Sequence, residues 1–177
     1  MKGIILAGGN SERLGVLTRT RATSAMPVGG SFRSIDFALS SMSNSHVQTV
    51  AVLTQYNSRS LNEHLSSSKW WNFGRKNGGM YLFTPTVTAD NSDWYRGTAD
   101  AIYQNIDFLK KRHEPYVIIS SGDCVYKIDF NALVDYHIEK KSDITIVCKD
   151  MMPNVDVSRF GVVRMDGDSR IIEFEEK

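Results

Sequence analysis

Two adjacent glycines, Gly8 and Gly9, end the first apolar run of the chain, and an arginine, Arg13, follows four residues later. Glycines let backbone N–H groups approach phosphate oxygens closely, and an arginine holds a phosphate through its planar set of donors. A buried strand that gives way to such a loop is typical of a triphosphate site. The glycines alone are equally consistent with a plain junction between a strand and a turn.

A carboxylate, Asp123, stands just after another apolar run and is preceded by Gly122. A magnesium ion that bridges nucleotide phosphates needs one or two such carboxylates and keeps several waters. Aspartate is also common in turns and at helix N-termini, so Asp123 alone does not decide between these roles. Beside a phosphate-type loop, we favour the magnesium role.

Two further groups suit a nucleotide. Gln55 follows an apolar run, and its amide could read a base edge through a paired donor and acceptor. Residues 94–98, Trp-Tyr-Arg-Gly-Thr, place aromatic rings and a cation at a helix start, where free N–H groups are offered. A loop anchored by a buried Trp94 is the alternative for this group.

The other reactive side chains indicate no site. The four histidines are scattered, which favours neither histidine-centred catalysis nor a metal site, and no Ser–His–Asp or Cys–His arrangement can be argued. We expect Cys124 to be a small buried residue rather than a nucleophile. We expect Trp70 and Trp71 to pack in the core or at an interface.

Strands and helices alternate along the chain and position these side chains. Continuous apolar runs predict buried parallel strands, and apolar residues at helical spacing predict helices between them. The expected strands are residues 3–7, 47–53, 80–83, 116–119, 144–147, 161–165 and 170–174. The expected helices are residues 35–42, residues 58–66, residues 98–109 with the basic residues 110–112 at the end, and a helix that starts at Asp129 or Asn131 and continues to about Lys141. Residues 67–93 show little pattern, which is typical of a functional loop or lid.

This alternation favours an α/β fold, an open, mostly parallel Rossmann-like twisted sheet with helices on both faces. In such sheets, ligands bind outside the carboxyl ends of the strands. The Gly8-Gly9 loop and Asp123 both lie at such ends.

Composition restricts the class of protein. The chain has 177 residues, which suits one domain, and its 21 basic and 20 acidic side chains leave a net charge of +1. That balance gives no support for binding to nucleic acid or to a membrane surface. Two cysteines without paired spacing argue against a disulfide framework or zinc site, and no apolar stretch approaches the ~18 residues of a membrane span. We expect a cytoplasmic protein and, because the chain stops straight after a strand, more protein beyond Lys177.

The motifs together resemble the N-terminal nucleotidyltransferase domain of the glucose-1-phosphate adenylyltransferases, also called ADP-glucose pyrophosphorylases. They run in family order over the whole chain: Ile5-Leu6-Ala7-Gly8-Gly9 with Arg13-Leu14, Arg33-Ser34-Ile35-Asp36-Phe37-Ala38-Leu39-Ser40, Val52-Leu53-Thr54-Gln55-Tyr56, Trp94-Tyr95-Arg96-Gly97-Thr98-Ala99-Asp100-Ala101, Ser121-Gly122-Asp123-Cys124-Val125-Tyr126-Lys127, Phe160-Gly161-Val162, and Ile172-Glu173-Phe174-Glu175-Glu176-Lys177. The fourth and fifth of these motifs are specific to this family among sugar nucleotidyltransferases.

The resemblance implies a reaction in which ATP and glucose 1-phosphate give ADP-glucose and pyrophosphate, as in glycogen or starch-type glucan synthesis. The sugar phosphate oxygen attacks the α-phosphorus in line, so the protein positions substrates and neutralises charge. By matching position, Arg13 and Asp123 would be the catalytic residues, and Asp123 would hold Mg2+. The resemblance assigns nucleotide binding to Ala7, Gly8, Gly9, Arg13, Gln55, Gly97 and Thr98, and glucose 1-phosphate binding to Gly161, Glu176 and Lys177.

The resemblance also implies a larger protein. Residues 1–177 would be the N-terminal part of the nucleotidyltransferase domain. The rest of that domain, with a second metal carboxylate, and a C-terminal left-handed β-helix are expected beyond this chain. An isolated piece of this length is therefore expected to be inactive. A homo- or hetero-oligomer is implied, a tetramer in the family, with no nucleic acid or membrane partner.

The chain departs from the family pattern in its phosphate-binding loops. Active members read Arg-Ala-Lys-Pro-Ala where residues 21–25 read Arg-Ala-Thr-Ser-Ala, so Thr23 replaces the lysine that neutralises the leaving pyrophosphate. A donor aimed at developing charge contributes ~10²–10³ in rate. Ser11 replaces the loop's third glycine, Gly15-Val16 replaces a proline-containing pair, and Cys124 stands where histidine is common.

Two hypotheses remain open. The loss of the lysine resembles the regulatory subunits of hetero-oligomeric members. The protein is therefore either an adenylyltransferase subunit with reduced activity or a non-catalytic subunit that binds nucleotide or sugar phosphate and assembles with an active one. A dinucleotide-binding oxidoreductase is disfavoured, because the glycines do not form Gly-x-Gly-x-x-Gly and no acidic residue ends the expected strand at residues 47–53.

Overall fold

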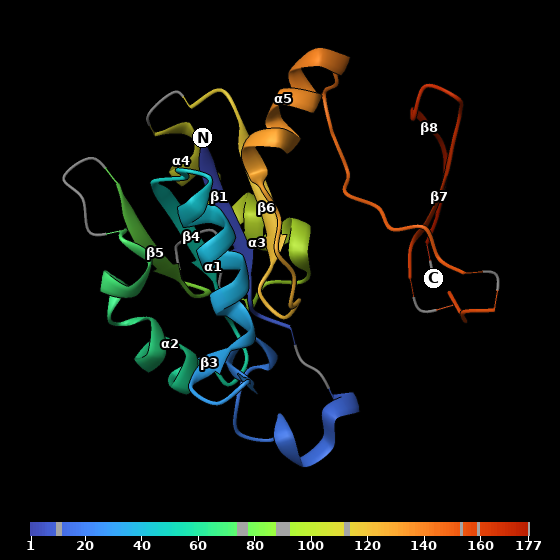
Figure 1. The fold of residues 1–177 in the computed structure, drawn as a ribbon. Coiled ribbons are helices and arrows are strands. Elements are labelled where there is room, and N and C mark those ends of the chain that lie inside the picture. Colours follow the sequence, from blue (N-terminus) through green and yellow to red (C-terminus); the bar gives the residue numbers. More distant parts are fainter. Residues whose placement is uncertain are drawn as a thin grey trace. The chain divides into compact units, whose positions relative to one another are not determined.

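The chain folds into two compact units, Met1–Lys141 and Ser142–Lys177, in a computed structural model (Figure 1). The structure describes residues 1–9, 12–73, 78–87, 93–111, 114–152, 154–158 and 160–176. None of the helices in these ranges is long and apolar enough to cross a membrane.

The first unit is built on a parallel sheet of four strands in the order β5-β4-β1-β6 (Figure 1). The strands are β1 (Lys2–Leu6), β4 (Thr49–Leu53), β5 (Gly79–Phe83) and β6 (Val117–Ser121). From β1 the chain builds β4 and then β5 outward on one side, and it returns to the other side of β1 for β6. Such a reversal of strand order is the place where open α/β sheets bind ligands.

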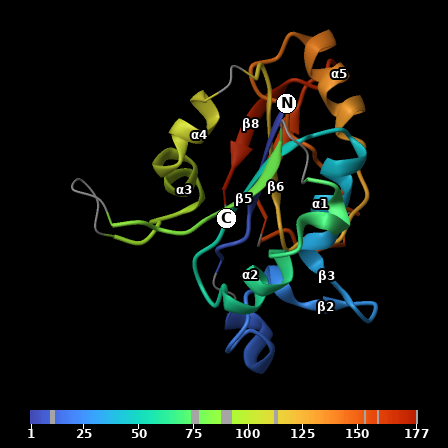
Figure 2. The same cartoon turned by 90° about the vertical axis from the view of Figure 1, so that its left-hand side faces the viewer.

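Helices cover both faces of the sheet (Figure 2). One face carries α1 (Ser34–Asn44), α2 (Arg59–Leu65) and α5 (Phe130–Lys140), and the other carries α3 (Thr98–Gln104) and α4 (Ile106–Lys110). Side chains of the central strands alternate between two cores, because successive strand residues point to opposite faces. Ile5 and Val52 enter the core beneath α1, whereas Ile4 and Leu53 enter the core beneath α3. The α/β fold predicted from the sequence is confirmed.

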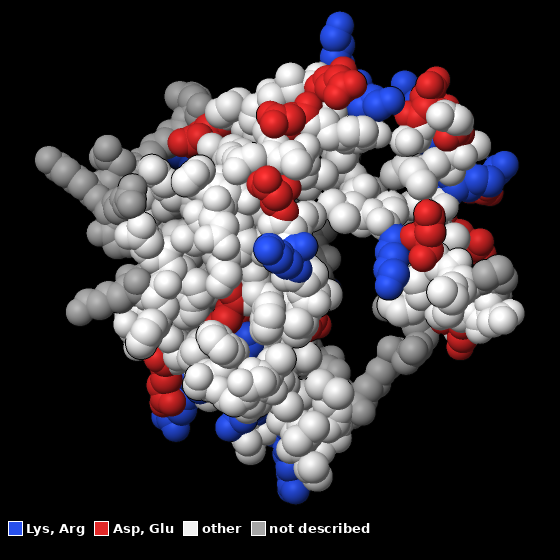
Figure 3. Space-filling view, viewed as in Figure 1, with Lys and Arg blue, Asp and Glu red and all other residues white. Residues whose placement is uncertain are grey.

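Shorter elements complete the first unit. They are the antiparallel pair β2 (Pro27–Val28) and β3 (Phe32–Arg33), and the 3-10 turns η1 (Glu12–Leu17), η2 (Thr23–Ala25) and η3 (Ser68–Trp71). In η3, Trp71 is buried as expected, whereas Trp70 is exposed. On the face of this unit seen in Figure 3, acidic and basic side chains are interspersed rather than grouped by sign.

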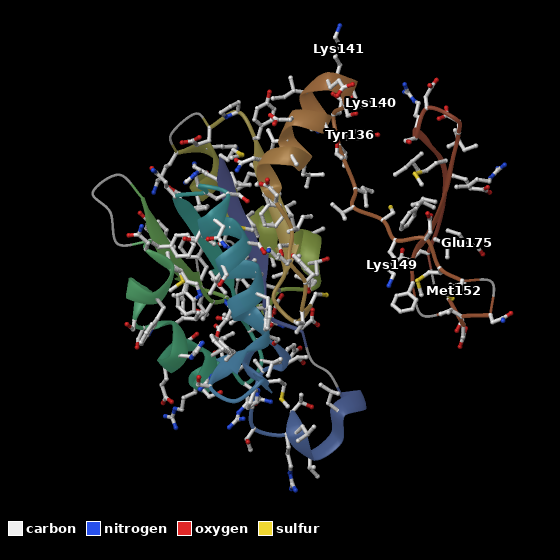
Figure 4. All side chains as sticks on the ribbon, in the orientation of Figure 1. Tyr136, Lys140, Lys141, Lys149, Met152 and Glu175 are labelled. Atoms are coloured by element: carbon white, nitrogen blue, oxygen red, sulfur yellow. The ribbon has the colours of Figure 1, made fainter. Side chains whose placement is uncertain are left out.

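Helix α5 has clear start and stop signals. The Asp129 carboxylate accepts a hydrogen bond from Asn131 N–H (2.9 Å), which caps the first turn. The helix ends at Lys141, whose φ of 50° is left-handed. In the last turn, Lys140 Nζ lies 5.8 Å from the centre of the Tyr136 ring, and all three side chains project from this end of α5 (Figure 4).

The single helix predicted for residues 98–109 is wrong, because the structure has two helices with a break at Asn105. The Asn105 side-chain N–H₂ donates to Ala101 O (2.9 Å) and to the Tyr95 hydroxyl (3.0 Å). Such side chain–backbone bonds compete with the helical ladder, and the backbone of Asn105 departs from helical geometry.

Two further expectations about strands are wrong. The predicted strand at 116–119 was expected to be covered on both faces, but Val117 and Ile119 of β6 are exposed while Ile118 is buried. Ile119 pairs with Ile4, so Val117 and Ile119 point to the face of the sheet that carries α3 and α4, and the described core on that face does not extend to β6. The predicted buried strand at 144–147 is not a strand, and Ile144 is 78% exposed. A strand requires a ladder partner, and no described segment pairs with these residues.

The second unit contains an antiparallel hairpin of β7 (Val162–Met165) and β8 (Ile171–Glu175), close to the two strands predicted there. Arg164 Nε donates to the Glu173 carboxylate across the hairpin at 2.7 Å.

The buried Lys2 ties β1 to the end of α4. Its side chain is 1% exposed, and Nζ donates to Phe108 O (2.7 Å), Leu109 O (2.8 Å) and Lys111 O. Carbonyls at a helix end have no partner within the helix, so a buried ammonium there satisfies both partners. Nζ also lies 5.3 Å from the centre of the Phe108 ring.

We expect Lys2→Met to lower the free energy of unfolding by ~2–4 kcal/mol, because buried carbonyls would lose their donor. Urea unfolding measures the effect, and Lys110→Met on the exposed side of α4 is the matched control. Equal stability of the two variants would contradict a stabilising role for the Lys2 ammonium.

Candidate active site

A cavity of about 410 Å³ opens at the carboxyl ends of β4, β1 and β6. Its lining comes from four parts of the chain that meet at the switch point of the sheet. They are the end of β1 with its loop (Leu6, Ala7, Gly8, Gly9), η2 (Thr23, Ser24), the end of β4 with the start of α3 (Leu53, Gln55, Tyr56, Tyr95, Arg96, Gly97, Thr98, Ala101), and the end of β6 (Ser121, Asp123). Most of the residues predicted for nucleotide and metal binding therefore lie around one cavity.

The two glycines after β1 have different structural reasons to lack a side chain. A Cβ at Gly8 would lie 3.1 Å from Gln55 Cβ and 3.2 Å from Gln55 N, so the close approach of the two strand ends favours glycine there. A Cβ at Gly9 would meet nothing within 4 Å. Gly9 lines the cavity, so its missing side chain leaves room on the ligand side.

Arg13 lies in η1, but its side chain, like residues 10 and 11 of the loop, is outside the part of the chain that the structure describes. The prediction that Arg13 holds phosphate therefore stays a prediction.

Gln55 is buried, and its side-chain amide is already paired. Oε1 accepts a hydrogen bond from Tyr95 N–H (2.9 Å), and Nε2 donates to Tyr95 O (3.4 Å). The sequence suggested instead that this amide reads a base edge. In the structure, both the oxygen and the nitrogen of the amide hydrogen-bond to the backbone of Tyr95, in the segment before α3.

The segment that precedes α3 forms the neighbouring wall. Arg96 N–H donates to Asp100 Oδ2 (2.9 Å), and Arg96 NH2 lies 3.8 Å from Asp100 Oδ1. Gly97 has an extended φ of 173°, and a Cβ there would meet nothing within 4 Å. Gly97 thus resembles Gly9, since neither the backbone angle nor packing requires glycine.

Trp94 is 60% exposed, so the alternative that a buried Trp94 anchors this loop is wrong. Its ring stacks on that of Tyr56, with the centres 5.8 Å apart and the planes 9° apart. The buried anchor is the next residue, Tyr95, which packs with Leu53 and Ala101. Burial raises the pKa of the Tyr95 phenol, which stays protonated and accepts from Asn105.

Asp123 projects from the end of β6 with one carboxylate oxygen engaged. Oδ1 accepts from Ser121 Oγ and from Cys124 Sγ (3.7 Å), and these are the hydrogen bonds that the described residues make to this carboxylate. Oδ2 is therefore the oxygen available to a cation. Gly122 is needed for close packing, because a Cβ would lie 3.0 Å from Ser24 Oγ and 3.1 Å from Ile5 Cγ2.

A magnesium ion fits this arrangement as an ion that takes one ligand, Asp123, from the described residues. Within the described ranges, no three His, Cys, Asp or Glu side chains come together as a metal site. Mg2+ is commonly held by one or two carboxylates, with phosphate oxygens and water as its other ligands. Asp123 is thus suited to a metal that arrives with a nucleotide.

Thr23 lines the cavity from a well-fixed turn. Ala22 N–H donates to Asn57 O (3.2 Å), Ser34 Oγ donates to Thr23 O (3.0 Å), and Met26 N–H donates to the same carbonyl (3.0 Å). These bonds hold η2 between the start of α1 and the loop before α2.

The residues predicted for sugar phosphate binding belong to another part of the chain. Gly161 and Glu176 are in the second unit, and Lys177 is outside the described residues. A Cβ at Gly161 would lie 3.0 Å from Phe174 Cζ, so Gly161 is packed against β8. Their role in binding sugar phosphate stays a prediction.

Sequence reasoning missed several lining residues. Leu6, Tyr56 and Ser121 lie close to predicted residues within recognised motifs, but no periodicity tells which side chains at a strand end face a cavity. Adjacency to a strand end was the one available signal.

Cys124 is exposed, so the expectation of a buried cysteine is wrong. The position directly after Asp123 places it on the open end of the sheet. Partial burial of the thiol, and then the charge of Asp123, raise the pKa of Cys124.

We expect alkylation of Cys124 to have its pH midpoint above ~8.5, because the thiolate is the reacting species. Asp123→Asn removes one cause of the raised pKa and should shift the midpoint downward. Iodoacetamide labelling from neutral to strongly alkaline pH in a Cys148→Ser background measures both values. A midpoint below the ordinary thiol value of ~8.5 in the protein with Asp123 intact would overturn the assignment.

Comparison with known proteins assigns the chain to a family. Residues 2–177 match the model of the family described as nucleotidyl transferase. The chain belongs to the nucleotidyl transferase family. This family assignment agrees with the parallel sheet and with the cavity at its switch point.

The chain is also similar to curated proteins that are named as glucose-1-phosphate adenylyltransferases. The chain is 46% identical to "Glucose-1-phosphate adenylyltransferase" of Clostridium novyi (strain NT) over 177 residues, which is all of this chain and 46% of the relative. It is 47% identical to the protein of the same name from Thermotoga sp. (strain RQ2) over 174 residues, 98% of this chain and 41% of the relative. The resemblance predicted from the motifs is confirmed. The chain spans less than half the length of these relatives.

Proposed function

We propose that this site binds ATP and glucose 1-phosphate and takes part in forming ADP-glucose and pyrophosphate. In this reaction, a phosphate oxygen of glucose 1-phosphate bonds to the α-phosphorus, and the bond from the α-phosphorus to the bridging oxygen breaks. Pyrophosphate leaves with that bond's electrons. The observation that carries the proposal is the gathering of Gly8, Gly9, Gln55, Gly97, Thr98 and Asp123 around one cavity at the switch point.

The cavity lining suggests an orientation for ATP. The wall from β4 and α3 is mainly apolar and aromatic, with Leu53, Tyr95 and Ala101, and it suits a base. The opposite end holds backbone glycines, hydroxyls and the carboxylate of Asp123, which suit phosphates and a cation. We therefore place the base near β4 and the phosphates between the β1 loop and β6.

The roles of the chain's residues follow from this orientation. Gly8 and Gly9 bring backbone groups to the phosphates, and Arg13 neutralises phosphate charge. Asp123 holds Mg2+, which when bound neutralises phosphate charge and orients the phosphate oxygens for in-line attack. By resemblance, Gly161, Glu176 and Lys177 bind glucose 1-phosphate.

The presence of Thr23 in place of lysine favours a reduced rate of catalysis. It is also consistent with the second hypothesis, a non-catalytic regulatory subunit. The side chain at this cavity position has no charge to offer the leaving pyrophosphate. A subunit of this kind is either a slow enzyme or a regulatory partner that binds nucleotide or sugar phosphate and assembles with an active subunit. Activity of the complete protein alone, compared with activity after addition of a lysine-containing subunit, separates the two.

The proposal concerns a longer cytoplasmic protein. We place residues 1–177 in the N-terminal part of the nucleotidyltransferase domain, followed by the rest of that domain and a left-handed β-helix. A homo- or hetero-oligomer is proposed from the family resemblance. The isolated 177 residues should be inactive.

We expect Gly9→Ala and Gly97→Ala each to weaken ATP binding by at least about fivefold. One added methyl group in a filled site costs ~1–3 kcal/mol, and neither methyl group meets protein atoms within 4 Å. Isothermal titration with Mg-ATP on the complete protein measures the affinity, and coupled release of pyrophosphate from ATP and glucose 1-phosphate measures the reaction.

Gly167→Ala is the matched control, since its Cβ also meets nothing within 4 Å and its position is a turn of the second unit. Unchanged ATP affinity in both cavity variants would mean that the nucleotide binds elsewhere.

A further inference from the structure

The side-chain amide of Gln55 hydrogen-bonds to the backbone of a segment that is distant in the sequence. Gln55 lies two residues after Leu53, the last residue of β4, and Tyr95 lies 40 residues further along the chain. The amide exchanges two hydrogen bonds with one residue, accepting from Tyr95 N–H and donating to Tyr95 O. The two residues of a hydrogen-bonded pair in an antiparallel ladder exchange bonds in the same way, so the Gln55 amide pairs with the Tyr95 backbone as a strand residue would.

Three other contacts hold the same segment, and each differs from the Gln55 pair. Tyr56 stacks on Trp94, but both rings are exposed. The Tyr95 hydroxyl accepts from Asn105 Nδ2, which fixes the ring rather than the backbone. Arg96 N–H reaches Asp100, which belongs to α3 itself. Among the described residues, Gln55 therefore makes the buried side-chain hydrogen bonds between the end of β4 and the main chain that leads to Gly97, alongside the packing of the Tyr95 ring with Leu53.

We propose that Gln55 is a positioning residue that fixes the main chain of residues 95–98 as the wall of the nucleotide cavity and does not itself read the base. To read a base edge, the amide would have to give up both bonds to Tyr95 and leave buried backbone groups without partners, which is costly. The proposal rests on the proposed function only for the identity of the ligand.

The first test uses amide hydrogen exchange in the protein without nucleotide. Gln55→Met keeps the length of the side chain and removes both bonds. We expect exchange at the Tyr95 amide to accelerate by about tenfold, the effect of losing one hydrogen bond. Gln55→Glu keeps an acceptor for Tyr95 N–H and should lie between wild type and Gln55→Met.

Gln48→Met is the matched control, because Gln48 is an exposed glutamine just before β4, at the opposite end of the same strand. Exchange at Ile118 of β6 reports any global loss of stability. Unchanged exchange at Tyr95 in Gln55→Met would overturn the proposal.

The second test compares the affinities of ATP and GTP. A positioning role predicts that Gln55→Met weakens both by the same factor, about tenfold, so that their ratio stays within about twofold. A base-reading role predicts a changed ratio, and that result would also overturn the proposal. If the wild-type protein binds no ATP, the proposed function fails, while the exchange experiment still decides the role of Gln55.

Discussion

Thr23→Lys should form ADP-glucose about 10²-fold faster than the wild-type protein. A lysine at this position places an ammonium group in the cavity, where negative charge develops on the leaving pyrophosphate. The turn that carries it is fixed by Ala22, Ser34 and Met26, so the new side chain would start from a defined backbone position. Steady-state synthesis and pyrophosphorolysis by the complete protein measure the effect.

Thr20→Lys is the matched control for this experiment. Thr20 is exposed, lies three residues before Thr23 and does not line the cavity. We expect no change in rate from the added charge there. Fast turnover by the wild type, with little further gain in the Thr23→Lys variant, would show that another cation serves the pyrophosphate. Slow turnover in both proteins would favour the regulatory subunit.

Asp123→Asn should lower the rate by about 10²–10³-fold, measured in the Thr23→Lys background so that the starting rate is high. The amide keeps the shape of the carboxylate but loses the negative charge that attracts the metal to Oδ2. The Mg2+ concentration that gives half-maximal rate should rise in the same variant. Rates across a titration of Mg2+ at saturating ATP give both quantities.

Asp135→Asn on the exposed side of α5 makes the same chemical change away from the cavity. It should leave the rate and its Mg2+ dependence unchanged. If the Asp123→Asn protein needs the same Mg2+ concentration for half-maximal rate, Asp123 is not a ligand of the metal, whatever the rate of the variant.

The sequence predicted the parts of this fold that depend on local pattern. Apolar runs such as residues 3–7 and 47–53 carry their own signal for buried strands, because a central strand needs apolar residues on both faces. The position of Asp123 followed from the same reasoning, since a polar residue after a buried strand lies at the carboxyl edge. The gathering of the strand ends around one cavity then follows from the parallel order of the sheet.

The parts that were wrong or missed depend on partners distant in the sequence. Residues 144–147 have the composition of a strand, but composition does not supply a neighbour for a ladder. The break at Asn105 depends on where its side chain finds acceptors, at Ala101 and Tyr95. Gln55 has a polar side chain close to a strand end, as a ligand-binding residue would. Only the folded structure shows that its amide is hydrogen-bonded to the backbone of Tyr95.

The strand order also determines how long each strand waits for its neighbours while the chain is being synthesised. Among the strands of this chain, β1 is synthesised first, and it is an inner strand whose two neighbours are β4 and β6. Its second neighbour is complete only at Ser121, 115 residues after Leu6. At ~5–20 residues per second, that interval lasts about 6–23 s. Throughout it, Ile4 and Ile5 have at least one edge of their strand unpaired, so chaperones must protect this central segment of the sheet for the whole interval.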